Sequence, residues 1–241
     1  MNFDEFNNVV PRFFDRTQAG RRLAKALWRY RQKPDTIVAG IPRGGVFTAA
    51  AVAESLELPV DVVPVGEVQV PGHDELIAGA VSADGVRVMN EDVISAFQLV
   101  PERVEAEIHR RLLDLEIRQQ FSRRDQPSFA GRTVIIVDDG IATGSTMDAA
   151  IQVVRRAGAE RIVVAVPVGA PDRCERLRSR VDHFVCLETP EPFFGIAYWY
   201  THFPSVDERE VTHTVTQTQW SPLGTGVIRP AWEVPHFDQT R

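Results

Sequence analysis

The sequence predicts an α/β protein in which an open, mostly parallel sheet is flanked by helices. Two strand–helix–strand runs indicate this class, one in residues 36–65 and one in residues 134–166. Such alternation joins parallel strands through crossover helices. With 241 residues, of which 44% are hydrophobic, the chain can bury one sizeable core. We therefore expect one α/β domain with appendages.

The first strand–helix–strand run follows an N-terminal helix. Apolar residues recur at helical spacing in residues 19–28, and Pro34 ends that helix. Residues 36–39 then predict the first strand, residues 46–56 the next helix and residues 61–65 the second strand. Together they supply the first half of the expected sheet.

The second run begins with four consecutive apolar, mostly β-branched residues at 134–137. This composition suits a central strand that is covered on both faces. Residues 145–157 have the apolar spacing of a helix, and residues 162–166 predict the next strand. Residues 171–180 and 181–187 predict a last helix and a last strand, which completes the sheet.

The two runs are separated by a segment of different character. Residues 66–90 contain short β-prone pieces. Residues 101–124 predict one long charged helix, in which glutamates and arginines alternate along the surface. Its apolar stripe consists of Val104, Ile108, Leu112 and Leu115.

The domain organisation follows from these elements. We expect residues 1–217 to form one domain, with a small hood built from residues 1–33 and 189–217. Residues 218–241 lose all periodicity and are rich in proline, glycine and tryptophan. We therefore expect them to form a C-terminal arm.

Composition excludes several classes of function. The net charge of −6 argues against a general nucleic-acid or anionic-membrane binder. The chain has no apolar run of about 18 residues, so we expect no membrane partner. Two cysteines are too few for a disulfide framework, which favours a cytoplasmic location. The six histidines show no metal-ligand spacing, so we predict no protein metal site.

The segment after the central strand carries the most chemistry. Asp138 and Asp139 end the strand, and a turn of small residues precedes the next helix. A helix N-terminus offers unpaired N–H donors to a phosphate, and carboxylates accept hydrogen bonds from a ribose diol. The segment therefore predicts a site for a ribose 5-phosphate, with an ordinary strand–turn–helix capped by two aspartates as the alternative.

A second glycine-rich turn follows the first strand. Residues 40–45 would let backbone donors approach an anion closely, and Arg43 could add a bidentate contact to pyrophosphate. The alternative is a tight turn with a surface arginine. Because ligands bind outside the carboxyl ends of parallel strands, the turns at 40–45, 138–146 and 167–171 should share one edge.

The segment from residue 134 to residue 146 closely resembles the PRPP-binding signature of type I phosphoribosyltransferases. Over roughly residues 12–215, the chain resembles a bacterial phosphoribosyltransferase-like subgroup. The resemblance implies ribose binding by Asp138 and Asp139, and catalytic roles for both and for Arg43. It assigns the 5-phosphate to Ala142, Thr143, Gly144, Ser145 and Thr146, and the pyrophosphate to Pro42, Arg43, Gly44 and Gly45.

The resemblance implies a transferase that displaces pyrophosphate from C1 of PRPP by a base or another nucleophile. Mg²⁺ would be bound mainly through the oxygens of PRPP itself. The rival hypothesis is a regulatory protein that binds PRPP or a nucleotide without turnover, and a third is an enzyme that releases phosphate from such a ligand. We expect a homodimer, the commonest soluble assembly.

The chain departs from the family pattern at two places. Gly66-Glu67 stands where subgroup members usually have Arg-Lys, which removes two cations, adds an anion near the mobile pyrophosphate-binding loop and favours the regulatory hypothesis. Ala142 stands where enzymes of 6-oxopurines usually have an aspartate, which disfavours hypoxanthine and guanine as acceptors. The aromatic residues Tyr198, Trp199, Tyr200 and Phe203 line either a base pocket or the core, and core packing is the favoured interpretation.

Overall fold

The computed structural model describes residues 10–121, 129–206, 210–211 and 214. Its main sheet has five parallel strands in the order β2-β1-β6-β7-β8. Their bounds are β1 Thr36–Gly40, β2 Val60–Val62, β6 Thr133–Val137, β7 Arg161–Val168 and β8 His183–Glu188. The predicted open parallel sheet is confirmed.

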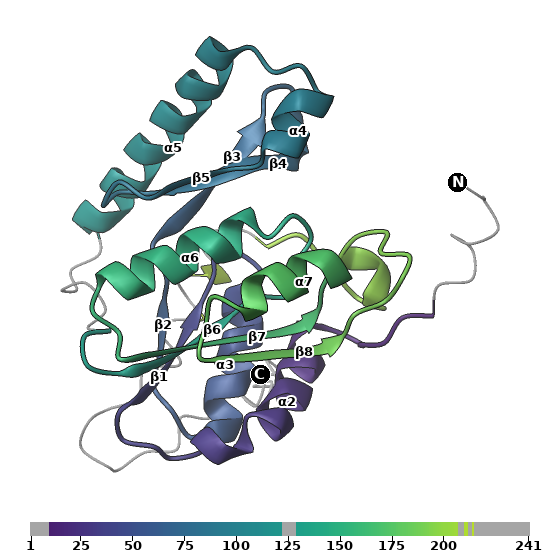
Figure 1. Ribbon diagram of the computed structural model, residues 1–241. Coiled ribbons are helices and arrows are strands. Elements are labelled where there is room, and N and C mark those ends of the chain that lie inside the picture. The colour runs from purple at the N-terminus through teal and green to yellow at the C-terminus, as the bar shows by residue number, and fades with distance from the viewer. Residues whose placement is uncertain (1–9, 122–128, 207–209, 212–213, 215–241) are drawn as a thin grey trace, which may run out of the picture.

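Helices cover both faces of this sheet (Figure 1). The helices α2, α3, α6 and α7 span Arg16–Ala26, Gly45–Leu56, Ser145–Arg156 and Pro171–Arg178, and a short 3-10 helix, η1, spans Trp28–Tyr30. On one face α2 and α3 bury Leu23 and Val52 against Val38 and Ile135. On the other face α6 packs Ile151 in the cluster that contains Ile136. Successive strand residues therefore point into two separate cores, as expected for a sheet covered on both faces.

The segment between the two halves forms a second, antiparallel sheet with the strand order β3-β4-β5. Its elements are β3 Val65–Val70, β4 His73–Ser82, β5 Arg87–Met89, α4 Glu91–Ala96 and α5 Pro101–Phe121. The predicted stripe of α5 packs Val104, Ile108 and Leu115 against Val68 and Val81. In Figure 1 this small lobe lies above α6, on the side opposite the main sheet.

The prediction of one strand at 61–65 is wrong. The chain leaves the parallel sheet after Val62, and β3 of the small sheet begins at Val65. Pro64, which has no N–H to donate to a ladder, lies between them. The N–H of Val63 still donates to the carbonyl of Gly40 at 2.9 Å, so this break lies directly beside the end of β1.

Two segments far apart in the sequence meet beside the main sheet. Phe13 forms an isolated bridge with Tyr200, which directly follows the short 3-10 helix η2 Ala197–Trp199. Phe13, Trp199 and Tyr200 are buried together with Val168. The favoured core-packing interpretation thus describes Trp199 and Tyr200, whereas Tyr198 is exposed. The predicted arm at 218–241 lies outside the described residues.

Candidate functional site

The three glycine-containing turns that were expected at one sheet edge do lie there. The N–H of Ile41 donates to the carbonyl of Val137 at 3.0 Å, which joins the turn after β1 to the end of β6. The N–H of Ile141 donates to Val168 at 3.0 Å, and the N–H of Ala170 donates back to Ile141 at 2.8 Å. These bonds tie the turns after β1, β6 and β7 into one surface at the carboxyl ends of the strands.

Asp139 is buried and ion-paired. Its Oδ2 accepts a hydrogen bond from Nε of Arg16 at 2.8 Å, and both side chains are nearly inaccessible to solvent. The Arg16 guanidinium lies 3.7 Å from the centre of the Phe203 ring and donates to the carbonyl of Pro204 at 2.8 Å. The Tyr200 hydroxyl donates to the Asp139 carbonyl at 2.7 Å. The first residue of α2 therefore fixes the second acid of the motif.

Asp138 is less enclosed and has no cationic partner of its own within ion-pair distance among the described residues. Its Oδ1 accepts a hydrogen bond from the N–H of Asp139 at 2.8 Å. Burial, and then the adjacent Asp139 carboxylate, raise the pKa of Asp138 well above its ordinary value. Burial also raises the pKa of Asp139, although Arg16 opposes that shift. Of the two acids, Asp138 has the side chain that is free to accept bonds from a ligand.

The turn after β1 lies directly against these acids. A Cβ atom at Gly45 would come within 2.6 Å of Asp138 Oδ1 and 2.8 Å of its Cα, and a Cβ at Gly44 would overlap Asp139 Oδ2. Only glycine fits at either position without displacing its neighbours. The Pro42–Arg43 peptide bond is cis. Arg43 is exposed, with Nη1 at 3.5 Å from the carbonyl of Val206.

The turn at 142–146 leads into the first residues of α6. Gly144 has φ = 82°, a left-handed conformation that turns the chain into the helix. Within the described part of the chain, no side chain makes a capping hydrogen bond at this end of α6. The backbone donors of the first helical turn therefore point outward, as the phosphate prediction requires.

Sequence reasoning missed the role of Glu67 in this geometry. Strand β3 places its carboxyl group 3.5 Å from the Thr146 hydroxyl, which donates to it. Burial raises the pKa of Glu67, and the Asp139 carboxylate adds to the shift, while Arg43, Arg111 and Thr146 oppose it. The sequence marked Gly66-Glu67 as a departure, but nothing in the sequence indicated that its carboxyl group faces the two aspartates.

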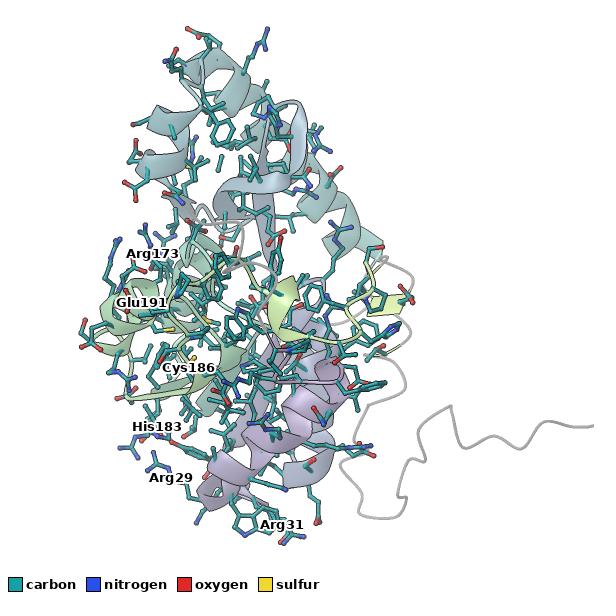
Figure 2. The ribbon with its side chains drawn as sticks, turned by 90° about the vertical axis from the view of Figure 1, so that its right-hand side faces the viewer. Arg29, Arg31, Arg173, His183, Cys186 and Glu191 are labelled. Carbon is teal, nitrogen blue, oxygen red and sulfur yellow. The ribbon has the colours of Figure 1, made fainter. Side chains whose placement is uncertain are left out.

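A cavity of about 310 Å³ lies beside the same turn. Thr143, Gly144 and Ser145 form one wall, and the start of α4 and one side of α7 form the others. Arg173 of α7 crosses this space to Asp92 of α4, with 2.9 Å between Nη2 and Oδ2. In Figure 2 it lies nearer the small lobe than do Arg29 and His183, which are at the opposite end of the molecule.

Two negative findings concern the described residues only. No helix within 10–121, 129–206 or the short described pieces beyond them is long and apolar enough to cross a membrane. The same part of the chain contains no group of three or more His, Cys, Asp or Glu side chains that could hold a metal ion.

Comparison with known proteins gives one consistent result. The family model described as "Phosphoribosyl transferase domain" matches residues 14–200. A Mycobacterium tuberculosis protein named "Putative phosphoribosyl transferase Rv0571c" is 40% identical over 229 residues, which are 94% of this chain and 52% of that protein. The chain thus spans about half the length of this relative. The crystal structure of TT1426 from Thermus thermophilus is 36% identical with a TM-score of 0.67, covering 87% of this chain and 100% of that one.

Proposed function

Because the chain belongs to the phosphoribosyl transferase domain family, we propose that it transfers the phosphoribosyl group of PRPP to a nucleophile and releases pyrophosphate. The observation that carries this proposal is the order of three subsites along one sheet edge. The turn before α6 suits the 5-phosphate, the two aspartates suit the ribose diol, and the glycine turn after β1 suits the pyrophosphate.

The two aspartates have different roles at the ribose. Asp139 is held by Arg16 and positions the end of β6, whereas Asp138 accepts hydrogen bonds from the ribose hydroxyls. As pyrophosphate leaves C1, positive charge develops on the ribose ring, as in glycoside cleavage. Carboxylates fixed beside the ring before the reaction stabilise this charge without reorganising.

The leaving group faces Arg43 and the backbone of Gly44 and Gly45. Arg43 is exposed, so its guanidinium can approach a pyrophosphate oxygen from solvent. A Mg²⁺ ion bound with PRPP would neutralise charge on the leaving pyrophosphate, and we propose that it would be held mainly by the oxygens of PRPP itself.

The acceptor is a base or another nucleophile other than a 6-oxopurine. Ala142 offers no carboxylate in the phosphate turn, where enzymes of 6-oxopurines usually have one. We propose that the enzyme is a cytoplasmic homodimer. We further propose one domain at 1–217, with hood segments at 1–33 and 189–217, and a C-terminal arm at 218–241.

The alternative is a protein that binds PRPP or a nucleotide without turnover. Glu67 favours it, because a carboxylate beside the subsites repels a polyanionic ligand. Phosphorus NMR of Mg²⁺–PRPP with the protein and pooled nucleobases separates the two. Base-dependent free pyrophosphate would support the transferase, and a perturbed PRPP spectrum without turnover would support the alternative.

The matched variant is Asp138→Asn, which leaves the Arg16–Asp139 ion pair intact. If Asp138 binds the ribose, this variant stays folded by circular dichroism but perturbs the PRPP spectrum much less. An unchanged spectrum with the wild-type protein at millimolar PRPP would contradict both hypotheses.

A further inference from the structure

The carboxyl group of Glu67 accepts a hydrogen bond from Thr146, a residue of the proposed phosphate subsite. The Thr146 hydroxyl donates to Oε1 of Glu67 at 3.5 Å. The same hydroxyl lies at the start of α6, where the phosphate turn ends. The Glu67 carboxyl group thus lies within long hydrogen-bond reach of a donor that we assign to the ligand.

The position of Glu67 is fixed from the small lobe. Nε of Arg111, on α5, donates to the main-chain carbonyl of Glu67 at 2.9 Å. The Arg111 side chain reaches this carbonyl across Gly66, where a Cβ atom would come within 2.7 Å of its Cδ. Because Gly66 has no side chain, the Arg111 side chain can pass over it and bond the carbonyl of Glu67.

Charges on four other elements surround the Glu67 carboxyl group. Asp139 and Asp138 approach from the end of β6, Arg43 from the turn after β1, and Arg111 from α5. Thr146 faces it from α6, and Arg16 of α2 partly neutralises Asp139. Two acids and two arginines face one carboxylate, so a dianionic ligand at Thr146 would add strong like-charge repulsion.

We propose that Glu67 is a specificity residue that competes with the ligand phosphate for Thr146, so that a phosphate binds only when Glu67 turns away or takes up a proton. This inference rests on the proposed function, because it requires the turn at 142–146 to be the phosphate subsite. Its consequence is selectivity. A ligand that fills only the phosphate subsite must displace Glu67 unaided, whereas PRPP gains contacts at the ribose and pyrophosphate subsites as well.

Sulfate is the appropriate probe, because it stays dianionic between pH 5.5 and pH 8 while phosphate monoesters titrate near pH 6. Sulfate affinity is measured by NMR titration for the wild-type protein and for Glu67→Gln. We expect Glu67→Gln to bind sulfate about tenfold more tightly at pH 7.5. The difference should become smaller as the pH falls toward the raised pKa of Glu67, which burial and then Asp139 shift upward.

Two control variants make the outcome specific. Glu105→Gln removes an equal charge from an exposed position of the same lobe and should leave sulfate affinity unchanged. Thr146→Val removes the shared donor, so in this background Glu67→Gln should gain much less. Equal sulfate affinities of wild type and Glu67→Gln at pH 7.5, or a gain from Glu67→Gln that is as large in the Thr146→Val background, would overturn the proposal.

The same variants separate this inference from the function it rests on. If Thr146→Val weakens sulfate and PRPP binding but Glu67→Gln changes neither, the phosphate subsite stands and the competition is wrong. If Thr146→Val and Glu67→Gln both leave sulfate and PRPP affinity unchanged, the assignment of the phosphate subsite is itself wrong.

Discussion

The five-stranded parallel sheet and the small antiparallel sheet both supply carboxylates to the site, but by different structural means. In the parallel sheet, Asp138 and Asp139 follow a fully buried strand, and the carboxyl ends of all such strands meet at one edge. In the small sheet, Glu67 lies within β3, and the side it faces depends on how that sheet packs. The sequence position of an acid therefore predicts that it lies at the site in the parallel sheet, but not in the small antiparallel sheet.

The pairing of β3 with β4 shifts register between Val68 and Gln69 and again between Gln69 and Val70, with the extra residues on β4. Glu67 lies before these shifts, and its neighbours Gly66 and Val68 are buried on the other face of the strand. Alternation therefore shows that Glu67 faces away from α5, but not which groups of the main lobe it faces. Arg111, which fixes Glu67, is a further 44 residues along the chain. The position of the Glu67 carboxyl group at the site therefore depends on tertiary packing and not on local sequence.

The largest effect that tests this comparison should come from Arg16→Met. Methionine leaves Asp139 buried without its cation, and it also loses the guanidinium contact with the Phe203 ring and the bond to the Pro204 carbonyl. We expect the free energy of unfolding to fall by about 3 kcal/mol, as when one partner of a buried pair is removed. Because Arg16 lowers the pKa of Asp139, the loss should be greater at pH 8 than at pH 5. Urea denaturation at both pH values measures it.

Arg16→Lys is the matched control, since it keeps a positive charge near Asp139 but loses the planar fork. Its loss of stability should be smaller than that of Arg16→Met. If Arg16→Met cost less than about 1 kcal/mol at pH 8, the edge of the parallel sheet would not depend on this buried pair, and the comparison would fail.

Much of the parallel sheet could be predicted from sequence because its signals are local. The predicted strands at 36–39 and 134–137 lie within β1 and β6, and the predicted helix at 46–56 differs from α3 by one residue. Continuous β-branched runs and glycine turns act within a few residues. The wrong strand at 61–65 shows the limit. Its residues suit a strand, but local preference cannot assign Val65 to a different sheet.

The site was predictable only where one segment carries the geometry. The acids and the phosphate turn are adjacent in sequence, so spacing placed them together. The Arg16–Asp139 pair joins residues 123 positions apart, and the sequence analysis assigned Arg16 no partner. The sequence predicts an anion at Glu67 near the pyrophosphate-binding loop, but only the packing of β3 and α5 on the main lobe brings its carboxyl group to Thr146.

A matched pair of glycine substitutions should sharpen the comparison with smaller effects. A Cβ at Gly45 would meet main-chain atoms of Val137 and Asp138 at 2.9 and 2.8 Å, which cannot move alone. A Cβ at Gly66 would meet the flexible Arg111 side chain instead. We expect Gly45→Ala to cost about 2 kcal/mol of stability and Gly66→Ala less than about 1 kcal/mol, by chemical denaturation. Equal costs would show that both regions are packed with the same tolerance.

A modest effect of the opposite sign, a gain of stability, is expected for Asp138→Asn. The folded protein holds the Asp138 proton more tightly than the unfolded chain, because burial and Asp139 raise its pKa. Its contribution to stability is therefore fully present below the ordinary carboxyl range and is lost as pH rises through the raised pKa. Asparagine cannot ionise, and its Oδ1 can still accept the N–H of Asp139. At pH 7.5 we expect the melting temperature to rise on the order of 3 °C, equivalent to about 1 kcal/mol, with little change at pH 4. A lower melting temperature at pH 7.5 would show that the Asp138 carboxylate stabilises the fold. Burial of this carboxylate at the sheet edge would then not destabilise the folded protein.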